Sequence, residues 1–148
     1  MSLNQRGAMD PPQVVRTLRL VLAVMLFSLC LYPVVITQVH DSSMTPPDRT
    51  FQFGLTLMGI VTASVVLYLR FVRIAGLYSP IEPMDDKTLA TQAWTYYILC
   101  YVFSEATALF GFVLAFMRGD PKLYVPLYLG GMLLMLLCYP RHPANESQ

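Results

Sequence analysis

The chain has 148 residues, of which 55% are hydrophobic and only 13% are charged, and its formal net charge is +1 at pH 7. Soluble domains carry about 25% charged residues, so this composition argues against an ordinary soluble domain and indicates a membrane protein. The near-neutral charge also argues against a nucleic-acid partner, because proteins that bind nucleic acids present strongly basic surfaces.

Four apolar stretches have the length of membrane-crossing helices, which need about 20 residues: 18–39, 53–74, 90–117 and 123–139. The first stretch is too long for a signal peptide and no small-residue cleavage site follows it, so we expect it to be retained. The connections are short, which favours antiparallel packing of neighbouring helices. The sequence therefore predicts an all-α membrane protein with a single domain over 1–148, folded as an antiparallel up-down-up-down four-helix transmembrane bundle.

Lysine and arginine are unequally divided between the two sides of this predicted bundle. One side has seven of the ten, namely Arg6, Arg16, Arg19, Arg70, Arg73, Lys87 and Arg141. The other side has Arg49, Arg118 and Lys122. Because cytoplasmic loops are enriched in these residues, we expect both termini in the cytoplasm and the protein in a bacterial inner membrane.

Pro33 interrupts the first predicted span. Proline has no N–H and its ring clashes with the preceding turn, so it kinks the helix and leaves the carbonyl of Leu29 without its usual donor. A kink can act as a hinge. In membrane helices a neighbouring helix commonly satisfies the freed group instead, and we favour that interpretation for Leu29.

Glu105 is the only charged residue in the segment 100–117 and lies near the midpoint of the third predicted span. An ionised acid at the bilayer centre costs on the order of 3 kcal/mol, so we expect its side chain to face the other helices. Small residues follow it at helical spacing and predict close approach of another helix. The small residues after Glu105 are Ala108, Gly111 and Ala115, and Ser104, directly before Glu105, belongs to the same set.

Two hydroxyl groups, those of Ser28 and Thr62, are predicted to lie near Glu105 in depth. Two interpretations stay open. In one, Glu105 binds a proton or cation with help from these hydroxyls, because intramembrane acids often mark ion pathways. In the other, a neutral carboxyl group hydrogen-bonds across helices and fixes how the bundle packs.

The segment FSEATALFGFVLAF, residues 103–116, resembles the acid-bearing helix of the proteolipid (c-type) subunits of rotary ATP synthases. The resemblance consists of an acid, small residues, an aromatic-glycine pair and an aliphatic run. It implies that Glu105 carries a transported proton or sodium ion. The family's glycine-rich partner helix and its Arg-Gln-Pro loop have no counterpart in this chain. As a whole, the chain resembles small four-span membrane proteins of bacteria.

The cysteines Cys30, Cys100 and Cys138 lie in apolar stretches without a CxxC spacing, which predicts buried core residues rather than disulfides or metal ligands. No catalytic motif, phosphate-binding loop or paired carboxylate is present in the sequence. We therefore expect a protein that is not an enzyme and that needs neither a metal nor a cofactor.

Glycines and a small alanine suggest close-packing faces on the second and fourth predicted spans: Gly54, Gly59, Ala63, Gly130 and Gly131. The function that the sequence favours is a non-enzymatic packing or accessory subunit of the lipid bilayer, which self-associates or joins a membrane complex. The alternative is a protein that binds or translocates protons or cations through Glu105.

Overall fold

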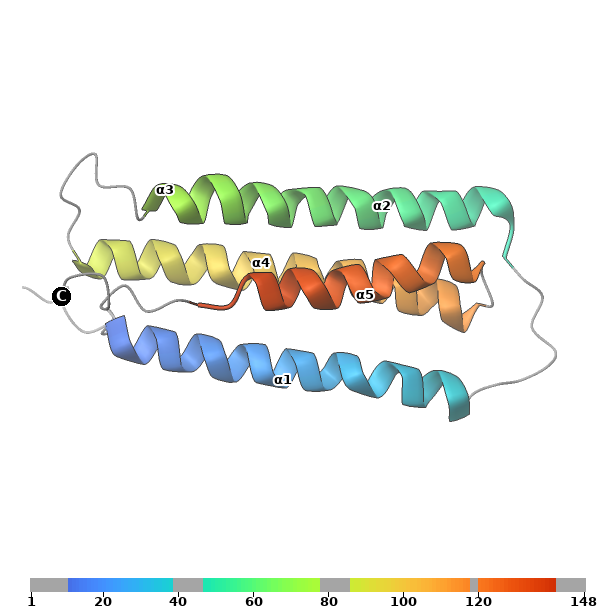
Figure 1. Ribbon diagram of the computed structural model, residues 1–148, viewed down its shortest axis with the longest axis horizontal. Coiled ribbons are helices and arrows are strands. Elements are labelled where there is room, and N and C mark those ends of the chain that lie inside the picture. The colour runs from blue at the N-terminus through green and yellow to red at the C-terminus, as the bar shows by residue number, and fades with distance from the viewer. Residues whose placement is uncertain (1–10, 39–46, 78–85, 118–119, 141–148) are drawn as a thin grey trace, which may run out of the picture.

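The computed structural model describes residues 11–38, 47–77, 86–117 and 120–140. These ranges are helical and contain no strand, which confirms the predicted all-α class. The elements are α1 (Pro11–Gln38), α2 (Arg49–Tyr68), the π-helical turn η1 (Leu69–Ile74), α3 (Ala75–Leu77), α4 (Asp86–Phe116) and α5 (Pro121–Leu137). Because α2, η1 and α3 follow one another without a break, they form one long rod (Figure 1).

Three helices are long and apolar enough to cross a membrane: Gln13–Gln38, Arg49–Leu77 and Thr88–Phe116. The fourth predicted span corresponds to α5, which is apolar but has only 17 residues. At 1.5 Å per residue α5 is about 26 Å long, slightly less than the hydrocarbon thickness of about 30 Å. By length and composition, the described part of the chain thus has three helices that could cross a membrane.

Figure 1 shows the four long helices lying side by side, each running opposite to the long helix before it in the chain. α4 contacts the other three helices, and its most extensive contact is with α5. α1 and α2 lie on opposite sides of the α4–α5 pair (Figure 1). The sequence prediction expected consecutive helices to be neighbours, which does not hold for α1 and α2. Ten residues, 39–48, connect α1 to α2. An extended chain of this length is longer than the diameter of a helix, about 10 Å, so α1 and α2 need not be neighbours.

The backbones of α4 and α5 approach each other closely because a glycine on each helix faces the backbone of the other. A Cβ atom added to Gly131 would lie 2.6 Å from the amide nitrogen of Ala108, and one added to Gly111 would lie 2.7 Å from that of Tyr128. The groove of small residues on α4 therefore receives α5. Ser104 and Ala108, which line this groove, are both fully buried.

The outer faces of α1 and α2 are apolar. Phe27 on α1 and Phe53 on α2 are 67% and 65% exposed. Of an apolar stretch of 18 residues in each long helix, 11% is buried inside the molecule in Gln13–Gln38, 17% in Arg49–Leu77 and 39% in Thr88–Phe116. The exposed apolar surfaces of α1 and α2 suit a lipid solvent. Because α4 is the most buried of the three and contacts all the other helices, it forms the centre of the molecule, and α1 and α2 form its flanks.

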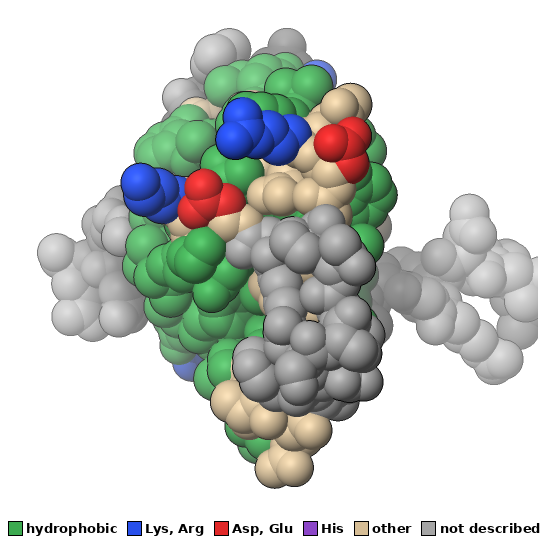
Figure 2. Space-filling view, turned by 90° about the vertical axis from the view of Figure 1, so that its right-hand side faces the viewer, with side chains coloured by type: hydrophobic (Ala, Val, Ile, Leu, Met, Phe, Trp, Pro, Cys, Tyr) green, Lys and Arg blue, Asp and Glu red, His purple; other side chains and the backbone are tan. Residues whose placement is uncertain are grey.

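The two ends of the molecule differ in charge. Figure 2 shows the end at which α1 finishes and α2 and α5 begin, where acidic and basic side chains lie over a mainly hydrophobic surface. The described charged residues there are Asp48, Arg49, Asp120 and Lys122. The described basic residues toward the opposite end, near the start of α1 and the end of α2, are Arg16, Arg19, Arg70 and Arg73.

Candidate functional site

Glu105 lies on the flank of α4 that faces α1, and its side chain is half-buried. Phe112 is two helical turns further along the same face, and its ring contacts that of Tyr32 in α1 with 4.8 Å between centroids. Within the described part of the chain, the Glu105 carboxylate makes no hydrogen bond and no ion pair. The acid thus sits beside α1 without a polar partner.

Ser28 approaches the same region from α1. α1 and α4 run in the same direction (Figure 1), so depths can be compared from the contact between Tyr32 and Phe112. Ser28 lies about 6 Å before Tyr32 and Glu105 lies about 10 Å before Phe112 along the two helices. Ser28 and Glu105 therefore lie on facing helices, within about one helical turn of each other in depth.

Thr62 pairs with Thr107 and not with Glu105. The two threonine Oγ1 atoms are 2.8 Å apart, and Thr107 is almost fully buried. Thr107 follows Glu105 by two residues, which turns it about 200° around the helix and directs it toward α2. The predicted group of Glu105, Ser28 and Thr62 is therefore divided between two sides of α4, because a difference of two positions reverses the direction of a side chain.

Two of the four glycines predicted to form close-packing faces pack inside the molecule. A Cβ atom added to Gly59 would lie 2.6 Å from Leu127 of α5, and Gly131 packs on α4. Gly54 and Gly130, in contrast, have no atom within 4 Å of an added Cβ atom. Gly59 and Gly131 thus serve contacts between helices of this molecule, whereas Gly54 and Gly130 leave space beside their helices.

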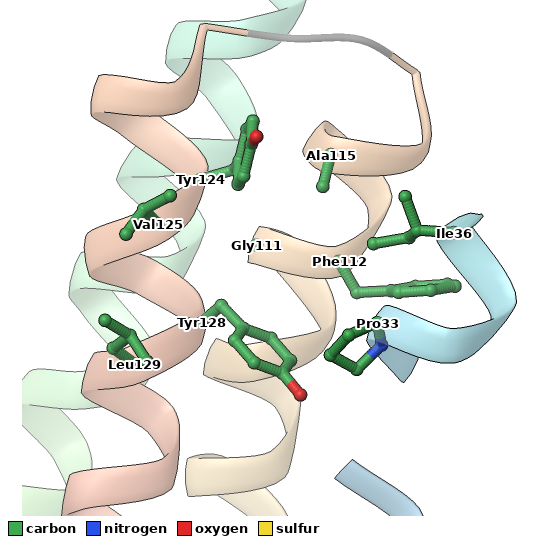
Figure 3. Close-up of a pocket in the computed structure, with 9 residues that line it drawn as sticks. All are labelled: Pro33, Ile36, Gly111, Phe112, Ala115, Tyr124, Val125, Tyr128 and Leu129. Atoms are coloured by element: carbon green, nitrogen blue, oxygen red, sulfur yellow. The ribbon is translucent and has the colours of Figure 1, made fainter. Parts of the chain in front are cut away.

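A cavity of about 230 Å³ lies between α1, α4 and α5, one helical turn or more beyond Glu105. Figure 3 shows its walls, which α1 lines with Pro33 and Ile36, α4 with Gly111, Phe112 and Ala115, and α5 with Tyr124, Val125, Tyr128 and Leu129. Its surface is apolar. Its lining therefore offers no polar group that would hold water or an ion beside the acid.

Pro33 lines this cavity, and α5 supplies a donor to the backbone carbonyl that this proline leaves without one. The hydroxyl of Tyr128 donates a hydrogen bond to the carbonyl oxygen of Leu29. Leu29 lies four residues before Pro33, so this is the carbonyl that proline deprives of its helical donor. The prediction that a neighbouring helix satisfies this group is confirmed.

A second group of side chains surrounds the C-terminal end of α5. The hydroxyl of Tyr101 donates to the carbonyl of Cys138 at 3.3 Å, and Arg70 Nε donates to the carbonyl of Leu137 at 3.2 Å. Both carbonyls lie at the helix end, where the backbone has no intrahelical donor of its own. Arg70 lies in η1, and π-helical turns occur frequently at functional sites.

Two cysteines also lie in this part of the molecule. Cys100 and Cys138 are both fully buried, and the carbonyl of Cys138 accepts its hydrogen bond from Tyr101, the residue after Cys100. Burial of Cys100 and Cys138 agrees with the sequence prediction, whereas Cys30 is exposed on α1.

The chain matches no protein-family model, no curated protein and no solved structure. Likeness to known proteins therefore assigns no function to the residues around Glu105, the cavity or the two buried cysteines. Their chemistry has to be inferred from their positions.

Proposed function

We propose that the chain is a four-span protein of the bacterial inner membrane, folded as an antiparallel bundle with both termini in the cytoplasm. α5 is short for a span, but it is apolar and lies along α4 (Figure 1). The excess of arginine near the start of α1 and the end of α2 supports the orientation. At that end the guanidinium of Arg19 lies 5.4 Å from the centre of the Tyr139 ring, and that of Arg73 lies 6.0 Å from Tyr68. Tyrosine and arginine both favour the membrane–water interface.

Within the membrane, we propose that the protein is a non-enzymatic packing or accessory subunit that associates laterally with further copies. The observation that carries this proposal is the position of α1 and α2 on opposite flanks of the α4–α5 pair (Figure 1). Each flank presents an apolar face through most of its length, and α2 has an open glycine, Gly54. Open glycines allow the backbones of two membrane helices to approach closely.

Cys30 offers a direct test of self-association because it is exposed on α1. The full chain in proteoliposomes is oxidised with copper phenanthroline and analysed on a non-reducing gel. We expect a covalent dimer that disappears in Cys30→Ser and persists in Cys100→Ser and Cys138→Ser, whose thiols are buried. A Gly54→Leu variant tests the α2 flank, with loss of energy transfer between labelled copies as the expected result. Monomers at every protein-to-lipid ratio would contradict the proposal.

A second candidate function is the binding of a proton or cation by Glu105. The specific observation in its favour is that other residues make the hydrogen bonds between helices, among them the pairs Thr62–Thr107 and Tyr128–Leu29. The Glu105 carboxylate has no hydrogen-bond partner in the described residues, so a packing role through hydrogen bonding has no support there. Intramembrane acids that lack a packing role are candidates for ion binding.

The variants Glu105→Gln and Glu105→Leu separate these roles. If the acid exchanges a proton, Glu105→Gln should retain helicity and assembly but lose carbodiimide labelling and proton flux in liposomes. If the acid is structural, Glu105→Gln should be silent and Glu105→Leu should destabilise the bundle. Absence of carbodiimide labelling and of proton flux in the unmodified protein would count against the ion-binding function.

A further inference from the structure

Two arginines reach the C-terminal end of α5 from different helices. Arg70 extends from η1 and donates its Nε–H to the carbonyl of Leu137 at 3.2 Å. Arg19 extends from α1, and its guanidinium carbon lies 5.4 Å from the centre of the Tyr139 ring. Leu137 and Tyr139 are two residues apart, so their Cα atoms are separated by no more than about 7 Å. Cations from both flanks of the α4–α5 pair therefore contact one three-residue segment.

Most of this positive charge has no counter-charge in the described part of the chain. Arg16, Arg19, Arg70 and Arg73 form no ion pair with a described carboxylate. Arg70 faces the negative end of the α5 helix dipole, which is equivalent to about half an elementary charge. Its bond to Leu137 uses one of the five N–H donors of a guanidinium. Among the described residues the other guanidinium donors of Arg19 and Arg70 make no hydrogen bond, so they can bind an anion.

Exposed apolar side chains lie beside both arginines. Leu20 directly follows Arg19 in α1, and its side chain is exposed. Phe71 directly follows Arg70 in η1 and is also exposed. The side chain of Leu137, at the end of α5, is exposed as well. Cationic groups and exposed apolar side chains thus occur together at this end of the molecule, which matches the two chemically different parts of a phospholipid.

We propose that Arg19 and Arg70 bind the phosphate group of an anionic phospholipid at the C-terminal end of α5. Guanidinium groups bind phosphate oxygens through paired N–H donors. The proposed orientation places this end on the cytoplasmic side, where basic sites between membrane helices recognise anionic headgroups. The acyl chains lie against the exposed apolar side chains of α1, η1 and α5. This inference rests on the proposed placement in a membrane but not on self-association.

Two tyrosines favour a lipid over a free phosphate ion as the source of the anion. Tyr139 lies beside Arg19, and Tyr68 lies 6.0 Å from the guanidinium of Arg73. Both tyrosine side chains are about half exposed. Tyrosine prefers the level of the lipid headgroups, so the arginines beside these rings lie at the depth of lipid phosphates.

The test is native mass spectrometry of the purified full chain in detergent. The chain is titrated with dioleoylphosphatidylglycerol and, as the zwitterionic comparison, with dioleoylphosphatidylcholine. We expect one phosphatidylglycerol to bind at least 5-fold more tightly than phosphatidylcholine. Arg19→Gln and Arg70→Gln should each weaken phosphatidylglycerol binding by about 5-fold, which corresponds to about 1 kcal/mol per basic residue near an anionic surface. Neither change should affect phosphatidylcholine binding.

Arg49→Gln is the matched control. Arg49 is exposed at the start of α2, at the opposite end of the molecule, so the variant should bind phosphatidylglycerol as the unmodified protein does. Glutamine at position 70 keeps an N–H donor for Leu137, and circular dichroism checks that the variant folds. Arg19 makes no hydrogen bond in the described part of the chain, so Arg19→Gln tests the proposal even if Arg70→Gln misfolds.

Four outcomes would overturn the proposal. The first is equal affinity for the two lipids, and the second is unchanged phosphatidylglycerol affinity in folded Arg19→Gln or Arg70→Gln. The third is an equal loss in Arg49→Gln, which would show a general effect of charge. The fourth is displacement of phosphatidylglycerol by inorganic phosphate, which would assign the site to a free anion. Failure of Cys30 cross-linking would leave the proposal unaffected, whereas recovery of the chain without detergent would contradict the membrane placement itself.

Discussion

The hydroxyl of Tyr128 in α5 donates a hydrogen bond to the backbone carbonyl of Leu29 in α1. Pro33 has removed the donor that this carbonyl would have within its own helix. The phenol therefore replaces a lost backbone bond and at the same time connects α1 to α5. The Tyr128 ring also forms a wall of the apolar cavity (Figure 3).

Tyr128→Phe is expected to lower the free energy of unfolding by about 1–2 kcal/mol, because it leaves the carbonyl of Leu29 unsatisfied. The measurement is reversible unfolding by sodium dodecyl sulfate in mixed micelles. In a Pro33→Ala background the same change should cost much less, since the alanine N–H restores the helical bond. Tyr124→Phe, in the same cavity wall, is the control. Equal losses from Tyr128→Phe in both backgrounds would show that the two residues do not share this carbonyl.

Thr107→Val is expected to destabilise the bundle by about 0.6 kcal/mol, the average for hydrogen bonds between membrane helices. Its hydroxyl pairs with that of Thr62 at 2.8 Å. Adding Thr62→Val should cause little further loss, because both changes remove one interaction. Thr56→Val is the control, since the Thr56 hydroxyl donates to Gln52 within its own helix. Additive losses from the two valines would argue against a shared bond.

Gly131→Ala is expected to cost about 1–3 kcal/mol, the usual range for overpacking. Its Cβ atom would lie 2.6 Å and 2.7 Å from backbone atoms of α4, which cannot move aside without separating the helices. The neighbouring change Gly130→Ala should be neutral or stabilising by up to about 1 kcal/mol, because that side is open and alanine favours helix. Unfolding of both variants in mixed micelles measures the difference, and equal effects would contradict the close approach of α4 and α5.

Xenon is expected to enter the cavity between α1, α4 and α5, because its walls are apolar and its volume is about 230 Å³. Xenon chemical shifts in solutions of the detergent-solubilised protein report uptake. Ala115→Val places two more methyl groups in the cavity and should reduce this uptake. Ala75→Val, at an exposed position of α3, should leave it unchanged. Water signals in place of xenon would identify the cavity as wet.

Several features of this protein follow from local sequence alone. Runs of about 20 apolar residues can satisfy their backbone groups in lipid only as helices, so the helices and their approximate ends could be predicted. Proline chemistry likewise identified Leu29 as the carbonyl in need of a donor. The donor itself, Tyr128, lies 99 residues away and could not be found from the chain near Pro33.

The neighbours of each helix were decided by the tertiary structure. Apolar residues surround these helices on all sides, so no hydrophobic stripe shows which face is turned inward. Depth in the bilayer could be counted along the sequence, but rotation about the helix axis could not. That rotation turns Thr62 toward Thr107 and away from Glu105, and it buries Cys100 and Cys138. Close packing of glycines, small side chains and a few hydrogen bonds sets it, because lipid removes the contrast between apolar and polar faces that orients helices in water.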